Sequence, residues 1–201
     1  MGLREVNAAR TRELILDAAL ELFVDRGYDA TTMEHVAEHA GIGTSTLYRY
    51  FPSKDQLVIE PLALQGHLSA ALLARPEEEP LDVALGHAVI SLIEAPRADQ
   101  QRLAKIDAAV ASSDALQVRL NEMFVHVRRE LAEAIGARLG RPGTDPYCIA
   151  TAGLTTLVLE LAADPENDAT IVLDAEAVVT RARALFRSLA DEPPTSPRLP
   201  E

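Results

Sequence analysis

The chain has 201 residues, of which 48% are hydrophobic and 25% are charged, so it can bury a substantial core as one domain or as a small domain joined to a larger one. Its single cysteine, Cys148, excludes an intrachain disulfide, and no apolar run approaches the roughly 20 residues that a membrane helix needs. The start "MGLREVNAARTRE" has no signal-peptide pattern, so we expect a cytoplasmic protein without a membrane partner.

The net charge of −12 argues at first against a nucleic-acid partner. The charge is unevenly distributed, however. Residues 1–12 contain three arginines and one glutamate, and residues 41–54 contain Arg49 and Lys54 but no acidic residue. Because phosphate binding depends on the charge of the docking face, the sequence remains compatible with DNA binding.

Hydrophobic residues recur at helical spacing along the chain, and no strand-like alternation competes with them, so the sequence predicts an all-α fold of about nine helices. The expected helices cover about residues 10–26, 32–40, 44–50, 54–74, 81–95, 98–112, 114–139, 146–163 and 174–190. We expect one domain over residues 1–56 and a second over residues 57–190. A polar, proline-rich tail over residues 191–201 is expected to be disordered.

Several expected helix ends have recognisable signals. Thr31 with Glu34 predicts a T-x-x-E capping box at the start of the second helix, and Gly41 is expected to end that helix in a left-handed conformation. Ser53 is the expected cap of the long fourth helix. Pro61 lies about two turns into this helix and is expected to bend it, because proline has no N–H to donate.

The segment "HVAEH", residues 35–39, has the H-x-x-E-H pattern of some zinc hydrolases. A zinc-dependent hydrolase that uses His35, Glu38 and His39 is therefore one alternative for the function. Zinc catalysis needs a third protein ligand and an enclosed cavity, and a two-turn helix provides neither. The other histidines stand alone on separate expected helices: His67, His87 and His126. We accordingly expect no enzyme, no metal and no other cofactor.

The same segment also begins a helix-turn-helix pattern, in which two short helices are joined by "AGIG". Ala37 is small enough for close helix crossing, Gly41 can make the turn, and Ile42 can fill the core beneath it. The inward face of the following helix is expected to hold Leu47, Tyr50 and Phe51. The outward side then holds Ser45 and Arg49, flanked by Thr46 and Tyr48. This arrangement is typical of a recognition helix, whose central side chains reach base edges while flanking hydroxyls bind phosphates.

The stretch "TRELILDAALELFVDRGYDATTMEHVAEHAGIGTSTLYRYFPSKDQLV", residues 11–58, resembles the DNA-binding domain of the tetracycline-repressor (TetR) family of bacterial transcriptional regulators. The resemblance implies a homodimer of helical subunits, each with a three-helix head and a larger C-terminal domain for ligand binding and dimerisation. It implies phosphate contacts by Thr32, Thr46, Tyr48 and Lys54. It implies base or near-base contacts by Met33, Thr44, Ser45 and Arg49, with Tyr50 at the edge of this surface. Gly43 stands at the recognition-helix cap, where family members often have Ser or Thr.

The C-terminal region resembles, over the run "AKIDAAVASSDALQVRLNEMFVHVRRELAEAIGARLGRPGTD", a TetR subgroup with acyl-CoA-like ligands. Aromatic residues are few after residue 51, so a pocket here is expected to be aliphatic. Candidate ligand-binding residues are His67, Val110, Met123, Phe124, Val127, Tyr147 and Thr151. Candidate dimer-interface residues on the last two helices are Ile149, Gly153, Leu157, Leu161, Val178, Ala182, Leu185 and Leu189.

Together these features predict a TetR-like transcriptional regulator that acts as a repressor. It is expected to bind a pseudo-palindromic double-stranded operator as a homodimer and to be released by a small lipophilic effector. Besides the zinc hydrolase, an effector-independent DNA-binding protein remains an alternative.

Overall fold

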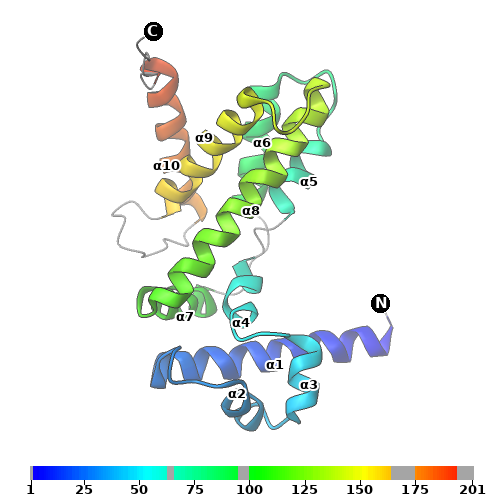
Figure 1. Ribbon diagram of the computed structural model, residues 1–201, viewed down its shortest axis with the longest axis vertical. Helices are drawn as coiled ribbons and strands as arrows, with labels where there is room; N and C mark the ends of the chain where they lie inside the picture. The colour runs from blue at the N-terminus through cyan, green and yellow to red at the C-terminus, as the bar shows by residue number, and fades with distance from the viewer. Residues whose placement is uncertain (1, 63–65, 95–99, 164–174, 194–201) are drawn as a thin grey trace.

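The structure is a computed structural model that describes residues 2–62, 66–94, 100–163 and 175–193. Within these ranges the regular structure is entirely helical, as the sequence predicts. Figure 1 shows a small head, formed by α1, α2 and α3, below a larger body formed by the remaining helices. The head helices are α1 (Leu3–Arg26), α2 (Met33–His39) and α3 (Thr44–Tyr50). The body contains α4 (Gln56–Ile59), the 3-10 helix η1 (Glu60–Leu62), α5 (His67–Leu73), α6 (Leu81–Glu94), α7 (Gln100–Ala111), α8 (Asp114–Leu139), α9 (Pro146–Ala163) and α10 (Ala175–Asp191).

The core of the head is built on one face of α1. Its apolar residues recur every three or four positions, which places them on one side of the helix, and α1 packs against α2, which in turn contacts α3. The largest fully buried side chains here are Ile15, Leu20, Phe23, Leu47 and Phe51. The Phe23 and Tyr28 rings meet edge to face with centroids 5.0 Å apart, which closes the turn after α1.

The start of α2 differs from the sequence prediction. Thr32, and not Thr31, is the N-cap: its Oγ1 accepts a hydrogen bond from the backbone N–H of His35, and its own N–H donates to Nδ1 of His35, both at 3.3 Å. The capping box therefore joins Thr32 with His35, and not Thr31 with Glu34. Thr31 is buried, and its hydroxyl donates to the carbonyl of Gly27 at 2.8 Å. Only Thr31 has a glutamate three residues later, but its burial and its bond to Gly27 leave Thr32 as the cap.

The prediction of one long fourth helix over residues 54–74 is wrong. The chain instead forms the short α4, the single 3-10 turn η1 that contains Pro61, and α5. Pro61 cannot donate to the carbonyl four residues earlier, and Gly66 then takes a left-handed conformation (φ 72°) directly before α5. Residues 63–65 lie outside the described ranges. This division accounts for ten labelled α-helices in the described chain, where about nine were expected.

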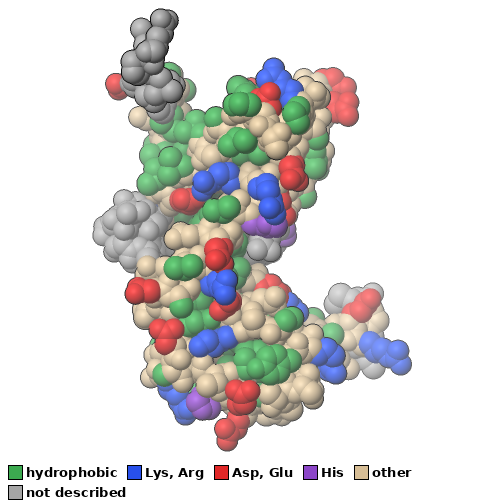
Figure 2. Space-filling view, viewed as in Figure 1, with side chains coloured by type: hydrophobic (Ala, Val, Ile, Leu, Met, Phe, Trp, Pro, Cys, Tyr) green, Lys and Arg blue, Asp and Glu red, His purple; other side chains and the backbone are tan. Residues whose placement is uncertain are grey.

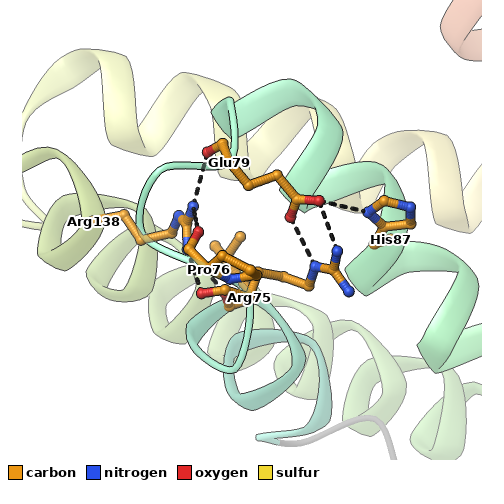
Figure 3. A network of polar contacts seen from close by, with 6 residues as sticks. Arg75, Pro76, Glu79, His87 and Arg138 are labelled. Carbon is orange, nitrogen blue, oxygen red and sulfur yellow. Dashed lines mark hydrogen bonds and ion pairs between the residues drawn. The ribbon is translucent and has the colours of Figure 1, made fainter.

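The long helix α8 is the central element of the body. It packs against α5 on one side and α9 on the other, and its N-terminal turn is capped by Ser113, whose Oγ accepts from the Leu116 N–H. Near its C-terminal end, Arg138 reaches the loop that joins α5 to α6 (Figure 3). There its guanidinium donates to the carbonyls of Arg75, Pro76 and Glu79 at 2.7 to 3.0 Å. These bonds satisfy carbonyls that have no helical partner, so the end of α8 holds the loop in place.

The helix α9 has an unusual distribution of apolar residues. It is 18 residues long and apolar enough, by length and composition alone, to cross a membrane, although no run of roughly 20 residues was expected from the sequence. Only 33% of this span is buried inside the chain. Large apolar side chains are exposed along it: Ile149, Leu154, Leu157 and Leu161. The exposed face of α9 is therefore the part of the body that most needs a partner.

Candidate nucleic-acid interface

The turn between α2 and α3 has the geometry expected of a helix-turn-helix. Gly41 lies at φ 66°, a left-handed conformation that residues with a side chain rarely adopt. The N–H of Ile42 donates to the carbonyl of Ala37 at 3.0 Å, which ties the turn back to α2. Ala37 is buried and small, so the two helices cross closely. These features fix the direction in which α3 leaves the turn.

The two sides of α3 differ sharply in exposure. Leu47 and the following Phe51 are fully buried and anchor the helix in the hydrophobic core. Ser45, Tyr48 and Arg49 are exposed, whereas Tyr50 is half-buried against the core. The predicted orientation of the helix is thus confirmed, and the outer face presents a hydroxyl, a phenol and a guanidinium side by side. The Arg49 guanidinium lies 5.5 Å from the Tyr50 ring, a contact that limits its freedom without occupying its donors.

The residues around this face divide into those that are accessible and those that are not. Thr44 and Thr46 are half-buried at the first turn of α3, and Thr32 is exposed at the start of α2. Met33, which the resemblance places at a base-contacting position, is only 7% exposed and belongs to the head core. Its thioether therefore packs against the head instead of facing outward, and we leave Met33 out of the interface. Gly43 caps α3 through its backbone alone.

Lys54 also differs from its expected place. Its Nζ donates to the carbonyls of Tyr28 and Thr31 at 2.8 and 2.9 Å and lies 4.0 Å from the centre of the Tyr28 ring. Desolvation lowers the pKa of Lys54. The ammonium group thus ties the segment after α3 to the turn after α1. A phosphate contact by Lys54 would have to share an ammonium group that already has two internal acceptors.

Three acidic residues of α1, Glu13, Asp17 and Glu21, contact basic residues of the body helix α7. Arg102 of α7 donates to Asp17 at 2.6 and 3.0 Å and also pairs with Glu13. Lys105 lies 3.8 Å from Glu21 on the same side. In Figure 1, α7 covers α1 from above, while α2 and α3 lie below it. These three carboxylates are paired with Arg102 and Lys105, so they add little negative charge to the face of the head that carries α3.

The H-x-x-E-H residues are occupied by interactions within the head. His35 belongs to the cap of α2, and Nε2 of His39 lies 3.1 Å from a carboxylate oxygen of Glu21. Among the described residues, no three His, Cys, Asp or Glu side chains are grouped so as to hold a metal ion. Within the part of the chain that the structure describes, the donors that a zinc hydrolase needs are not assembled around His35 and His39.

A groove of about 660 Å³ opens where α4, η1 and α5 face α8. Only His67 and Met123 of the expected ligand-binding residues line it. Val110 and Val127 are buried in the core, and Phe124 and Thr151 are half-buried elsewhere. Tyr147 is 53% exposed on α9. The groove residues that sequence reasoning missed are mostly polar: Ser53, Asp55, Gln56, Ile59, Glu60, Arg119, Glu122 and His126.

The expected dimer-interface residues also separate into two groups. Ile149, Leu157 and Leu161 are exposed on α9, as an interface requires, and Leu154 extends this face although the sequence analysis missed it. In Figure 2, hydrophobic side chains gather on the part of the surface formed by α9 and α10. Residues Val178 and Ala182 are instead buried within the subunit, where α10 packs against α9 and α6. The remaining members are partly buried: Gly153, Leu185 and Leu189.

A three-helix head whose third helix is anchored by apolar side chains and exposes a polar outer face defines the helix-turn-helix class of DNA-binding proteins. Residues 15–60 match the family model described as "Bacterial regulatory proteins, tetR family". The N-terminal domain is therefore similar to the DNA-binding domain of TetR-family regulators.

Two relatives support this assignment. Over 87 residues, which are 42% of this chain and 38% of the relative, the chain is 39% identical to the HTH-type transcriptional regulator TcmR of Streptomyces glaucescens. Over 52 residues, which are 26% of this chain and 24% of the relative, it is 52% identical to the HTH-type transcriptional repressor KstR of Rhodococcus jostii. The matched segments thus span well under half of either relative.

Similarity in fold extends over nearly the whole chain. The SmeT–triclosan complex superposes with a TM-score of 0.55 at 24% identity, covering 96% of this chain and 100% of SmeT. The TetR-family repressor FadR of Thermus thermophilus, in complex with lauroyl-CoA, superposes with a TM-score of 0.51 at 18% identity, covering 94% of this chain and 98% of FadR. At these identities the likeness concerns the fold alone.

Proposed function

We propose that this protein is a homodimeric transcriptional repressor that reads a pseudo-palindromic operator with α3. The observation that carries the proposal is the exposure pattern of α3, in which Leu47 is fully buried while Ser45 and Arg49 face outward. A helix of two turns anchored in this way can enter the major groove, where its outward side chains meet base edges. Repression, as opposed to activation, is proposed by analogy with KstR, which is named a repressor.

The outer face divides by chemistry into base and phosphate contacts. Arg49 carries a planar guanidinium suited to the O6 and N7 atoms of guanine, and the Ser45 hydroxyl can donate or accept. The hydroxyls of Thr32, Thr44, Thr46 and Tyr48 border this pair and are assigned to the phosphates, with Tyr50 at the margin. We assign no DNA contact to Met33, and Lys54 acts mainly by holding the head together.

The second subunit is proposed to cover the exposed face of α9. A symmetric pair of these faces would bury Ile149, Leu154, Leu157 and Leu161 against their counterparts. Such a dimer explains why α9 is apolar enough to cross a membrane although the protein is proposed to act on DNA in the cytoplasm. The apolar side chains would face the second subunit. The dimer would place two copies of α3 so that they read half-sites about 34–36 Å apart.

An effector is proposed to bind the body and release the operator. SmeT binds triclosan and FadR binds lauroyl-CoA, and both have the fold of this chain. We therefore retain a small lipophilic effector, with acyl-CoA-like molecules as one class. The groove between α4 and α8 is a candidate entry because Ile59 and Met123 give it apolar lining beside polar residues such as His67.

The test begins with selection of duplexes from a random DNA library by the full-length protein. We expect a sequence with two-fold symmetry to emerge and to bind by fluorescence anisotropy. Arg49→Ala should relax the preference at particular base pairs by about 1–3 kcal/mol, whereas Arg129→Ala, an exposed change on α8, should not. Unchanged specificity in Arg49→Ala would contradict the assigned orientation of α3.

The alternatives predict different results with the same protein. A library of hydrophobic compounds and acyl-CoA thioesters should yield at least one molecule that raises the melting temperature and lowers operator affinity. If none does so, the effector-independent alternative gains support. Metal analysis of the purified protein tests the zinc alternative directly.

A further inference from the structure

The first part of α1 projects beyond the head. The helix begins at Leu3, but the first residue that it contributes to the core is Ile15. At 1.5 Å per residue, twelve residues correspond to about 18 Å of helix. Figure 1 shows this end of α1 running past α3, with the N-terminus clear of the other described helices. We call residues 3–10 the basic arm.

The basic arm carries positive charge that no described residue neutralises. Arg4 and Arg10 are exposed, and neither forms an ion pair with any part of the chain that the structure describes. The one acidic residue, Glu5, accepts a hydrogen bond from the N–H of Gly2 at 2.7 Å and so caps the start of the helix. Asn7, which is also exposed, lies between the two arginines on the helix surface. Arg4 and Arg10 differ in this from Arg102 and Arg119, which are each bound by two carboxylates.

The base of the arm is fixed to the end of the recognition helix. The Arg12 guanidinium lies 4.5 Å from the centre of the Phe51 ring and pairs with Glu60 of η1. Phe51 is the residue that follows α3, and it is fully buried. The arm therefore leaves the head beside the C-terminal end of α3, in a direction set by packed contacts and by a continuous helix.

We propose that the basic arm binds backbone phosphates of the same duplex, outside the base pairs that α3 reads. The proposal rests on the proposed function, because α3 must first bring the duplex to the head. Guanidinium groups bind phosphate oxygens through paired hydrogen bonds, and such contacts carry no sequence information. Arg4 and Arg10 stand about 9 Å apart along the axis, so one arm can reach more than one phosphate of a strand. The arm thus lengthens the footprint without changing the sequence that is read.

The proposal is tested by comparing the affinity of the protein for a short and a long operator duplex. The operator selected by the full-length protein is prepared in two forms: one trimmed to the informative base pairs, and one extended at each end by about one helical turn of unselected sequence. Affinities are measured by anisotropy at several salt concentrations. We expect the wild type to bind the extended form about tenfold more tightly or better at low salt. The Arg4→Gln/Arg10→Gln variant should have the same affinity for both forms. This affinity should equal that of the wild type for the trimmed form.

Salt dependence adds a second readout. Two arginines per subunit make four per dimer, so the salt slope on the extended form should become shallower by up to about 3.6 units in the variant. The control Arg129→Gln/Arg141→Gln removes the same charge from exposed positions of the body and should keep the advantage of the extended form. The Arg4→Lys/Arg10→Lys variant keeps the charge and should retain most of the wild type's higher affinity for the extended form.

The outcomes separate the inference from the proposed function. If no sequence is selected, or if the trimmed duplex is not bound, the proposed function fails. If the wild type binds both duplexes equally, or if the Arg4→Gln/Arg10→Gln variant keeps the advantage of the extended form, the inference is overturned while the proposed function stands. Far-UV circular dichroism checks that the exposed substitutions leave the helical content intact.

Discussion

The Nε atom of Arg119, on α8, lies 2.9 Å from Oδ2 of Asp55, the residue that precedes α4. The other oxygen of Asp55 accepts the hydroxyl hydrogen of Tyr28, at the turn after α1. Burial first, and then this hydrogen bond, raises the pKa of Tyr28, so the phenol stays protonated and remains a donor. A body helix is thereby linked through one carboxylate to the turn that supports the DNA-reading head.

This link can be measured with a double-mutant cycle. Arg119→Gln and Asp55→Asn should each loosen the head, and the coupling energy between them should not exceed about 1 kcal/mol, because the Arg119 side chain is half exposed. Urea unfolding of the four proteins gives the coupling energy. Faster hydrogen exchange of head amides in Arg119→Gln is the independent readout. Strictly additive effects would show that the contact does not connect head and body.

Lys54→Met should destabilise the protein by about 1–3 kcal/mol, since it leaves the carbonyls of Tyr28 and Thr31 without their charged donor. The phosphate contact that the family resemblance implies for Lys54 predicts instead that the substitution spares the fold and makes the salt slope shallower by about one unit. Urea unfolding and operator titration distinguish the two roles. Unchanged stability with a shallower salt slope would restore the phosphate contact.

Pro61→Ala should allow the turns around η1 to join into a more regular helix, because alanine supplies the missing N–H. We expect higher helical content by circular dichroism, similar effector affinity, and a smaller effect of effector on operator affinity. Linkage allows this coupling to be measured from either ligand. An effector response equal to that of the wild type would show that the break at Pro61 is static.

Leu157→Arg should yield monomers that bind the operator poorly, because it places a charge at the centre of the exposed face of α9. Analytical ultracentrifugation gives the oligomeric state. Val83→Arg, an equally exposed position on α6, is the matched control and should leave the assembly unchanged. A fully dimeric Leu157→Arg protein would place the interface elsewhere.

Acid should weaken the loop between α5 and α6. The Arg75 guanidinium donates two hydrogen bonds to Glu79, and this interaction lowers the pKa of Glu79. A carboxyl whose folded-state pKa is depressed contributes stability above its unfolded pKa, near 4.3, and that stability is lost as the pH falls through the folded value. Glu79→Gln should therefore flatten the acid side of the stability profile, measured by urea midpoints, while Glu77→Gln in the same loop should not. Equal profiles for the two variants would contradict this role.

Sequence reasoning located the elements whose ends carry strong local signals. The expected bounds over 44–50, 114–139 and 146–163 coincide with α3, α8 and α9. Serine, proline and glycine stand at these helix ends, and each acts on its own backbone or its near neighbours. The inward and outward sides of α3 were likewise predictable, because burial follows helical periodicity.

The missed features depend on contacts between distant segments. Lys54 finds its acceptors 23 and 26 residues away, which no local pattern records. The N-terminal extension of α1 lacks an apolar stripe, so periodicity began the helix near residue 10 instead of Leu3. Val178 and Ala182 have the spacing of an interface, but α10 uses them inside its own subunit. Apolar residues at helical spacing predict that one face of a helix is buried. They do not predict whether the same subunit or a second subunit buries it.

The ion pair between Arg12 and Glu60 joins the base of the arm to the same turn that contains Pro61. Because the basic arm is a continuous part of α1, it turns with the head when a shift of η1 rotates the head about this contact. From Arg12 to Leu3 the helix extends about 13 Å, so a head rotation of about 10° displaces the tip of the arm by about 2 Å. The end of α3 lies beside Arg12 and moves less than the tip, so a rotation that leaves α3 in its groove still carries a guanidinium at the tip out of hydrogen-bonding range of a phosphate oxygen.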